Sequence, residues 1–305
     1  MGVIDTLSEG FRLVFRRPWL ALLPVLVDLS VWRAPKLSIS PIVSQLIGWL
    51  NGMAGALAST GGADPDAVTA LVQTLEETTA RTNLIGLIAS SRLGISAISA
   101  ALPIEVGDRI IELSQLWQMA FASLALVALG ILIGTAYLLL IAQSIRDEPI
   151  ALAPFVRVLF RSWASLALIS LVIGCAFVSA VLASSLVGIF AVFALLALGW
   201  ALLYASFFPQ AVTLAGHKPL NAVLSSLLVV RSSLWPTLGL LVLVNLLDTG
   251  LSLIWYRAIG SGSAVTFVAI LASAFVGTGL TAALFYFYRD RSAALRSLIM
   301  AQGKT

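Results

Sequence analysis

The sequence is poor in the residues that carry most protein chemistry. Its 305 residues include one cysteine, Cys175, and one histidine, His217. A single cysteine excludes an intramolecular disulfide, and a single histidine excludes a histidine-cluster metal site or a histidine-ligated haem array within the chain. The sequence also contains no recognisable catalytic motif. We therefore expect no cofactor, no metal and no enzymatic activity.

Charged residues are scarce as well. Lysine and arginine number 18 and aspartate and glutamate 14, so charged residues make up 10% of the chain, whereas hydrophobic residues make up 60%. Soluble proteins carry about a quarter charged residues. This composition predicts an all-α integral membrane protein, a polytopic transmembrane helix bundle in which residues 1–305 form a single membrane domain. We expect no nucleic-acid partner.

Long apolar runs locate the membrane spans. A bilayer core about 30 Å thick requires about 20 apolar residues in a helix. A shorter candidate, residues 18–32, contains Pro24 and Asp28 and can reach across if its helix begins inside the preceding amphipathic turn. Five further stretches satisfy the length requirement: 117–142, 163–184, 187–210, 234–256 and 265–288. We predict six spans.

The distribution of charge predicts the orientation of the spans. Basic residues gather before the first span, between the second and third, between the fourth and fifth, and after the sixth, whereas Arg257 is the only charge in the short turns of the opposite side. The positive-inside rule then places both termini in the cytoplasm. Tryptophans agree with an aromatic belt at both interfaces, with Trp19, Trp163 and Trp235 at inner ends and Trp32, Trp117 and Trp255 at outer ends.

The first two predicted spans are separated by a large exterior insert, residues 34–116. Two of its pieces are amphipathic at helical spacing, which predicts short helices that lie on the outer surface or cap the bundle. Their apolar faces comprise Ile42, Leu46, Leu50, Met53 and Leu57 in one piece and Leu84, Ile88, Ile95, Ile98 and Leu102 in the other. The alternative is that residues 37–59 and 83–104 both cross the membrane, which would give eight spans.

The chain also resembles itself. "FRLVFR" at 11–16 aligns with "VRVLFR" at 156–161, and a tryptophan and a span follow each copy. A shift of 70 residues aligns Arg161 with Arg231 and gives a third, weaker copy. We predict three tandem units, each an interfacial amphipathic helix followed by a transmembrane hairpin. They occupy about 1–145, which includes the insert, then 146–215 and 216–290, and residues 291–305 form a cytoplasmic tail.

Paired arginines characterise the amphipathic segments. In the second copy Arg157 and Arg161 stand together at the edge of an apolar stripe. Such a helix lies in the membrane interface with its arginines among lipid phosphates. The alternative is that the arginines serve topology alone. Lipid headgroup contact is predicted for Arg12, Arg16, Arg157, Arg161 and Arg231, with anionic phospholipids as the preferred partners.

These segments resemble a known kind of membrane domain. An arginine-bearing amphipathic segment followed by tryptophan and a hairpin, repeated over six spans, is similar to the membrane domain attached to some bacterial glycerophosphodiester phosphodiesterases. The resemblance implies a multi-pass protein of the bacterial inner membrane with a lipid-associated role. The phosphodiesterase domain itself is absent from this sequence, so the resemblance carries no hydrolase activity.

Polar residues inside the predicted spans are the remaining candidates for function. Ionisable residues within a membrane are costly and often functional. Asp28 lies in the first span, and Asn245, Asp248 and Ser252 share one face of the fifth. This strip could bind a cation or relay a proton, or it could join helices by hydrogen bonds. The composition and the arginine segments favour a non-enzymatic accessory or assembly subunit, or a lipid-interacting scaffold, which other membrane subunits could join. The alternative is a small-solute or ion transporter that uses Asp28 and Asp248.

Overall fold

A computed structural model describes residues 2–58, 65–88, 109–148, 151–186, 188–258 and 262–302 of the chain. Helices account for nearly all of this structure. The α-helices are α1 (Val3–Arg16), α2 (Leu22–Arg33), α3 (Ser40–Ala58), α4 (Pro65–Arg81), α5 (Leu116–Arg146), α6 (Leu152–Leu186), α7 (Gly188–Tyr204), α8 (Phe208–Thr213), α9 (Pro219–Ser232), α10 (Leu234–Ala258) and α11 (Ser263–Gln302). Two 3-10 helices, η1 (Pro18–Ala21) and η2 (Leu84–Ile88), and two short strands, β1 (Lys36–Ser38) and β2 (Ile110–Glu112), complete it.

Five of these helical stretches are long and apolar enough to cross a membrane. They are α5, α6, α10, α11 and the stretch Val192–Thr213, which runs from α7 into α8. Each coincides with one of the five long spans predicted from the sequence. The chain is therefore a helical membrane protein.

The shorter candidate span is divided differently from the sequence-based expectation. The amphipathic helix α1 ends before Pro18, and the 3-10 turn η1 separates it from α2, which has 12 residues. Proline is tolerated at the first position of a helical segment but not in its interior, so the "RRPW" sequence favours a break at this point. Together η1 and α2 extend about 26 Å, which is slightly less than the bilayer core.

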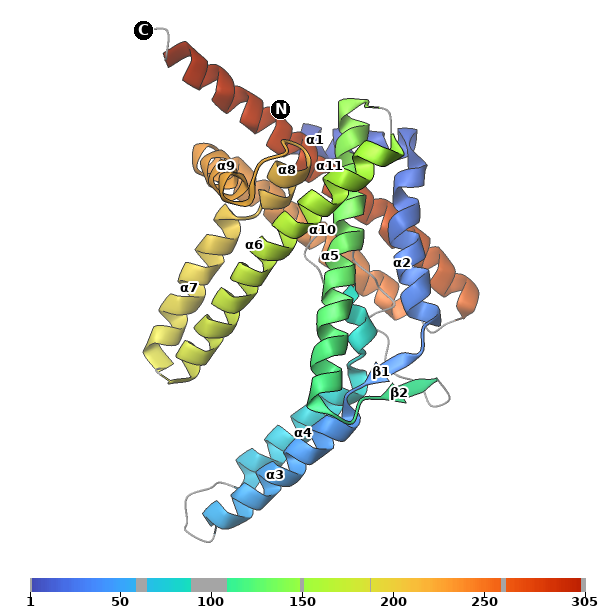
Figure 1. Ribbon diagram of the computed structural model, residues 1–305, viewed down its shortest axis with the longest axis vertical. Coiled ribbons are helices and arrows are strands. Elements are labelled where there is room, and N and C mark those ends of the chain that lie inside the picture. The colour runs from blue at the N-terminus through green and yellow to red at the C-terminus, as the bar shows by residue number, and fades with distance from the viewer. Residues whose placement is uncertain are drawn as a thin grey trace.

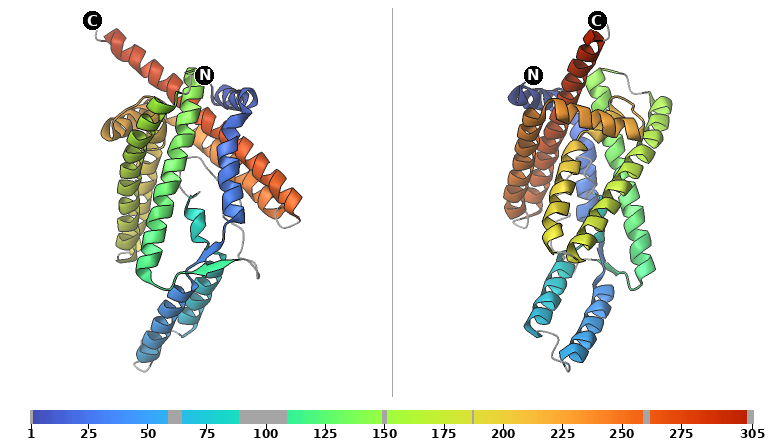
Figure 2. Two further views of the ribbon diagram at one scale, coloured as in Figure 1. Left: turned by 45° about the vertical axis from the view of Figure 1, so that its right-hand side comes forward. Right: turned by 90° about the vertical axis from the view of Figure 1, so that its left-hand side faces the viewer.

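The helices that run along the molecule meet two helices that lie across it. Both α1 and α9 are placed crosswise at one end of the bundle, beside the C-terminal parts of α5 and α11 (Figures 1 and 2). We call this the α1–α9 end. The α3–α4 hairpin projects from the opposite end, beyond the turns between the long helices (Figure 1).

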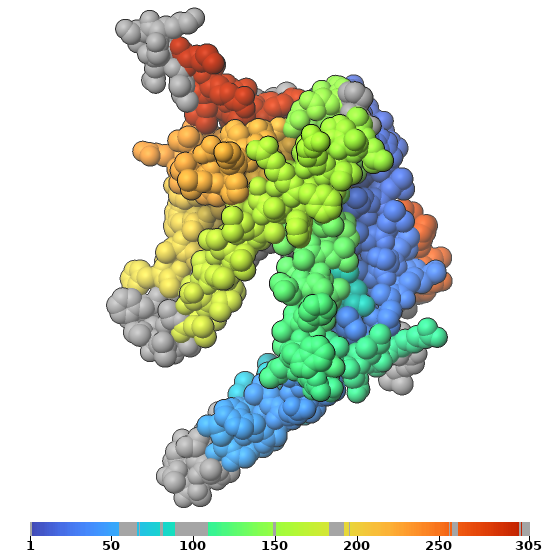
Figure 3. Space-filling model, in the orientation of Figure 1, coloured from blue at the N-terminus to red at the C-terminus, as the bar shows by residue number. Residues whose placement is uncertain are grey.

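The core lies between α5 and α11 and the elements packed on them. In the apolar stretches, 56% of α11 and 44% of α5 are buried, against 11% of α6 and 11% of α10. Figure 3 shows the α6–α7 hairpin diverging from α5, so that an open wedge separates them. Exposed apolar faces of this extent would be unfavourable in water, whereas in a bilayer the lipid chains cover them.

The second amphipathic segment is not a separate helix. The sequence-based prediction was an interfacial helix followed by a span, but α6 runs without interruption from Leu152 to Leu186. No proline occurs between Arg161 and Trp163, so the chain continues as a helix. In the other two copies the helix ends, at Arg16 and at Ser232, before the next one begins.

The insert differs most from the prediction. Helices α3 and α4 pair as a hairpin that extends away from the bundle, rather than lying on its surface or capping it (Figure 1). The parallel strands β1 and β2 were not predicted. Instead of a long helix over 84–102, the structure has the short η2, and residues 89–108 lie outside the described residues. Helix α3 extends beyond the ends of the long helices (Figure 1) and is not among the described helices long and apolar enough to cross a membrane, which argues against the eight-span alternative for residues 37–59.

The 3-10 helix η2 packs against the middle of α5 rather than remaining at the surface. A Cβ on Gly130 would lie 2.4 Å from the Ile88 carbonyl oxygen, so only glycine permits this approach. The amide oxygen of Asn83 accepts hydrogen bonds from the backbone N–H groups of Leu37 and Ile85, which ties β1 to η2. Irregular backbone at this depth is tolerated where the protein itself covers its polar groups.

Candidate functional site: the arginines of the α1–α9 end

Two arginines at the α1–α9 end use their side chains to bind other helices of the protein. The Arg17 guanidinium donates a hydrogen bond of 3.0 Å to the Ser144 carbonyl oxygen and forms a 2.6 Å ion pair with Asp147. Ser144 belongs to the last turn of α5, whose carbonyl groups lack helical partners and favour a nearby cation. Arg17 therefore fastens the end of α1 to the end of α5.

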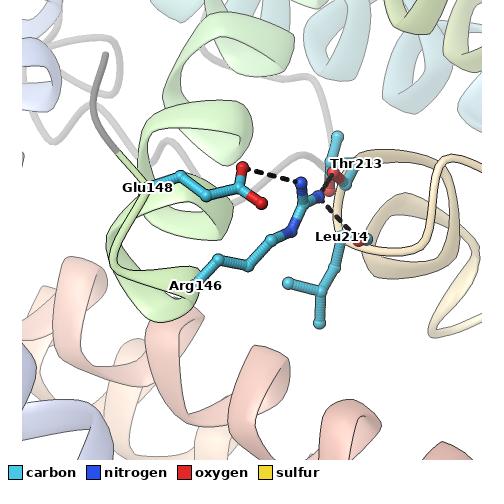
Figure 4. Close-up of polar contacts among 4 residues, drawn as sticks. All are labelled: Arg146, Glu148, Thr213 and Leu214. Atoms are coloured by element: carbon cyan, nitrogen blue, oxygen red, sulfur yellow. Dashed lines mark hydrogen bonds and ion pairs between the residues drawn. The ribbon is translucent and has the colours of Figure 1, made fainter.

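Arg146 fastens α5 to α8 in the same way. Its guanidinium donates hydrogen bonds of 2.8 and 2.6 Å to the carbonyl oxygens of Thr213 and Leu214 and lies 3.2 Å from a Glu148 carboxylate oxygen (Figure 4). These carbonyls end the short helix α8, so Arg146 acts as its C-terminal cap. The sequence had indicated only that Arg17 and Arg146 carry positive charge near the membrane, because partners 127 and 67 residues away leave no local pattern.

The five arginines predicted to contact lipid are placed differently. All five side chains are exposed. Arg12 forms a 2.6 Å ion pair with Glu9 one helical turn away. Within the described part of the chain, the other four, Arg16, Arg157, Arg161 and Arg231, form no hydrogen bond or ion pair through their side chains.

Helix α1 presents three distinct sides. One side packs on α11 and consists of Thr6, Gly10, Leu13 and Val14, spaced as one helical face. Two further sides are largely exposed. Ile4 and Phe15, exposed by 76% and 73%, form an apolar side, and Asp5, Arg12 and Arg16 form a charged side together with the half-buried Glu9. A helix fixed to a membrane bundle with an apolar and a charged side both exposed fits the boundary between acyl chains and headgroups.

The N-terminal part of α6 has a similar division. Ser162, Leu166 and Ile169 are buried, Leu152, Val156 and Phe160 are exposed, and Arg157 and Arg161 lie on the remaining side. Helix α9 departs from this pattern. Ser226 and Val230, which align with Val156 and Phe160 in the proposed repeat, are buried, and the exposed apolar row is Leu220, Leu224 and Leu228. The aligned arginine, Arg231, is nevertheless exposed.

The tryptophans near this end differ in their surroundings: two are exposed, and a third contacts a neighbouring helix. Trp235 is 81% exposed and Trp19 is 38% exposed, as an interfacial belt requires. Trp163 instead donates a hydrogen bond of 3.1 Å from its indole N–H to the Ala128 carbonyl oxygen in the middle of α5. Trp163, which is half-buried, therefore joins two helices, and its predicted place in the belt stays a prediction.

The intramembrane polar residues are not gathered into one built site. Asp28 is 2% exposed in α2, which packs on α11, whereas Asn245 is exposed and Asp248 and Ser252 are half-buried in α10. Among the described residues, no side-chain hydrogen bond joins Asn245, Asp248 and Ser252 to one another or to a neighbouring helix. The same described residues include no group of three His, Cys, Asp or Glu side chains able to hold a metal ion.

Comparisons of the chain with protein-family models, with curated proteins and with solved structures give no match. The resemblance to the membrane domain of glycerophosphodiester phosphodiesterases therefore stays a prediction.

Proposed function

We propose that this protein is a non-enzymatic membrane scaffold that binds anionic phospholipids through the α1–α9 end. The observation that carries the proposal is the division among the arginines of this end. Arg17 and Arg146 donate hydrogen bonds to carbonyl groups at helix C-termini. The other arginines in question are exposed and, within the described residues, have no protein partner: Arg16, Arg157, Arg161 and Arg231. Exposed guanidinium groups at a membrane surface can donate hydrogen bonds to the phosphate oxygens of lipid headgroups.

We further propose that η1 and α2 together form a sixth span and that the α1–α9 end lies in the cytoplasmic leaflet. The inner leaflet carries anionic lipid, and each arginine near it contributes about 1 kcal/mol of attraction, less where salt screens it. Arg12 contributes less than the others, since Glu9 neutralises it locally. This orientation places both termini in the cytoplasm of a bacterial cell and the α3–α4 hairpin outside.

Three consecutive units would account for the arrangement. The first comprises α1, α2 and α5 with the insert between the two spans, the second α6 and α7, and the third α9, α10 and α11. Each supplies one exposed arginine segment, so the units together surround the α1–α9 end with cationic contacts. The largely exposed faces of α6, α7 and α10 leave room for lipid or for other membrane subunits.

The proposal is tested by replacing Arg12, Arg16, Arg157, Arg161 and Arg231 with glutamine. These side chains are exposed, so the fold should persist. Native mass spectrometry would compare retained phosphatidylglycerol and phosphatidylethanolamine in the wild type and the variant. We expect the wild type to retain the anionic lipid preferentially and the variant to lose that preference. Equal retention of the anionic lipid by both proteins would contradict the proposal. The arginines would then serve only to set the orientation of the protein in the membrane.

A further inference from the structure

Helix α6 combines an arginine pair with an exposed apolar span on one face. It is a single helix of 35 residues, so the helical spacing that begins at Arg157 continues without interruption into the span. The residues that follow one another at intervals of three or four along this face are all exposed. We call this face the α6 strip; its residues are Arg157, Arg161, Ala164, Leu168, Val172, Cys175, Ser179 and Leu182.

The arginine pair of the strip is free of competing carboxylates. Arg12 is paired with Glu9 and Arg17 with Asp147, but within the described residues neither Arg157 nor Arg161 forms an ion pair. Side chains four residues apart on a helix have Cβ atoms about 6 Å from each other. Two guanidinium groups at that spacing can donate hydrogen bonds to the oxygens of one phosphate group between them.

The other two arginine segments lack this continuation. After Arg16 the chain breaks at Pro18, and α1 lies across the bundle rather than along it (Figure 2). After Arg231 helix α9, which is also crosswise, ends at Ser232. Of these three segments, only α6 has a face that carries the arginines and then continues along the molecule as an exposed apolar surface (Figure 1).

We infer that the α6 strip is a binding site for one anionic phospholipid, whose phosphate lies between Arg157 and Arg161 and whose acyl chain follows Leu168 and Val172 toward Cys175. The inference rests on the proposed function and specifies where the lipid binds. Arg161 and Cys175 are separated by 14 helical residues, about 21 Å along the axis. On a tilted helix this distance matches a headgroup and the roughly 15 Å acyl layer of one leaflet. Phosphate and chain contacts are therefore spaced as one lipid molecule requires.

The experiment uses photoreactive lipids in the full-length protein reconstituted in nanodiscs. A phosphatidylglycerol and a phosphatidylcholine, each with a diazirine at the middle of one acyl chain, are crosslinked by light, and the modified peptides are identified by mass spectrometry. The double variant Arg157→Gln/Arg161→Gln is compared with the matched control Lys218→Gln/Arg296→Gln, which also removes two exposed positive charges but touches no arginine assigned to lipid. Thermal unfolding of each protein verifies that it is folded.

We expect the anionic probe to modify residues 168–175 more than the zwitterionic probe does. The α6 double variant should lower this excess about tenfold, equivalent to 1.4 kcal/mol, and the Lys218→Gln/Arg296→Gln control should leave it unchanged. Excess inorganic phosphate should not displace the probe, since the strip holds the chain as well as the headgroup. Displacement by phosphate would mean recognition of a free anion and would overturn the lipid site.

The remaining outcomes separate this inference from the function on which it rests. If both double variants lower the anionic excess equally, positive charge attracts anionic lipid, but the α6 strip is not a distinct site. If neither variant changes it, the strip is wrong, and the variant with all five arginines replaced then decides whether the lipid-binding function is wrong as well.

Discussion

Gly10 of α1 lies directly against the backbone of Gly279 in α11. A Cβ added to Gly10 would stand 2.4 Å from the Gly279 carbonyl oxygen, and one added to Gly279 would stand 2.6 Å from the ring of Phe11. The crosswise helix is thus pressed onto the most buried long helix of the bundle. This contact fixes the direction in which α1 presents its apolar and charged sides.

Replacing Gly10 with leucine should therefore detach α1. Neighbouring backbone cannot move aside as a side chain can, so overpacking should lower the free energy of unfolding by about 1–3 kcal/mol or more. Thermal unfolding in detergent measures the loss. Gly239→Leu in α10 is the matched control, because a Cβ added to Gly239 would meet nothing within 4 Å. Equal stability of the two variants would mean that α1 does not depend on this contact.

Arg146→Met should loosen α8 from α5. Methionine keeps much of the side-chain length but donates no hydrogen bond, so the carbonyls of Thr213 and Leu214 lose their cap. Hydrogen bonds from charged groups contribute about 1.5–3 kcal/mol, and solvent access at this site favours the lower value. Hydrogen exchange of residues 208–214 should quicken in this variant and not in Arg231→Met, whose arginine has no partner among the described residues. Unchanged exchange in Arg146→Met would show that the cap is not needed.

Asp248→Asn should leave the protein folded and functionally unchanged. Asp248 is half-buried and, among the described residues, its side chain makes no hydrogen bond that the amide would break. We expect a change in unfolding free energy within about 0.5 kcal/mol. Proton uptake by reconstituted vesicles, followed with an entrapped pH-sensitive dye, provides the functional comparison. A flux present in the wild type and lost in this variant would favour the transporter that uses Asp28 and Asp248.

Orientation can be checked with single cysteines in a Cys175→Ser background. Asp66 on α4 and Lys218 before α9 are both exposed and lie at opposite ends of the molecule. On intact cells a membrane-impermeant thiol reagent should label Asp66→Cys and leave Lys218→Cys unmodified. The reverse result would place the α1–α9 end outside and invert the topology.

Apolar runs and prolines made much of the fold predictable. Long hydrophobic stretches located the five long helices, because a bilayer imposes a length that few other structures need. Pro18 marks the break after α1, and the absence of proline after Arg161 is consistent with the continuous α6. The β1–β2 pairing was beyond sequence analysis, since its three-residue strands are brought together from positions as distant as Lys36 and Ile110.

The candidate site was predictable only in part. Periodicity placed Arg157 and Arg161 on an exposed edge, as the structure has them. It could not distinguish Arg16 from the adjacent Arg17, because the difference lies in the Ser144 carbonyl and Asp147 carboxylate, which folding brings to Arg17 alone. The Glu9–Arg12 pair, three residues apart on one helix, is a local pattern that the sequence analysis overlooked, and the α6 pair has no such neighbour among the described residues.

The most direct measurement is tryptophan quenching by brominated lipids in bilayers of mixed composition. Trp19 and Trp235 are exposed at the α1–α9 end, so in a protein whose other six tryptophans are replaced by phenylalanine the fluorescence reports which lipids surround the arginines. At equal mole fraction, brominated phosphatidylglycerol should quench this two-tryptophan protein more strongly than brominated phosphatidylcholine. That difference should disappear when Arg12, Arg16, Arg157, Arg161 and Arg231 are also all glutamine. Equal quenching of the two-tryptophan protein by the two lipids, with all five arginines present, would contradict the account.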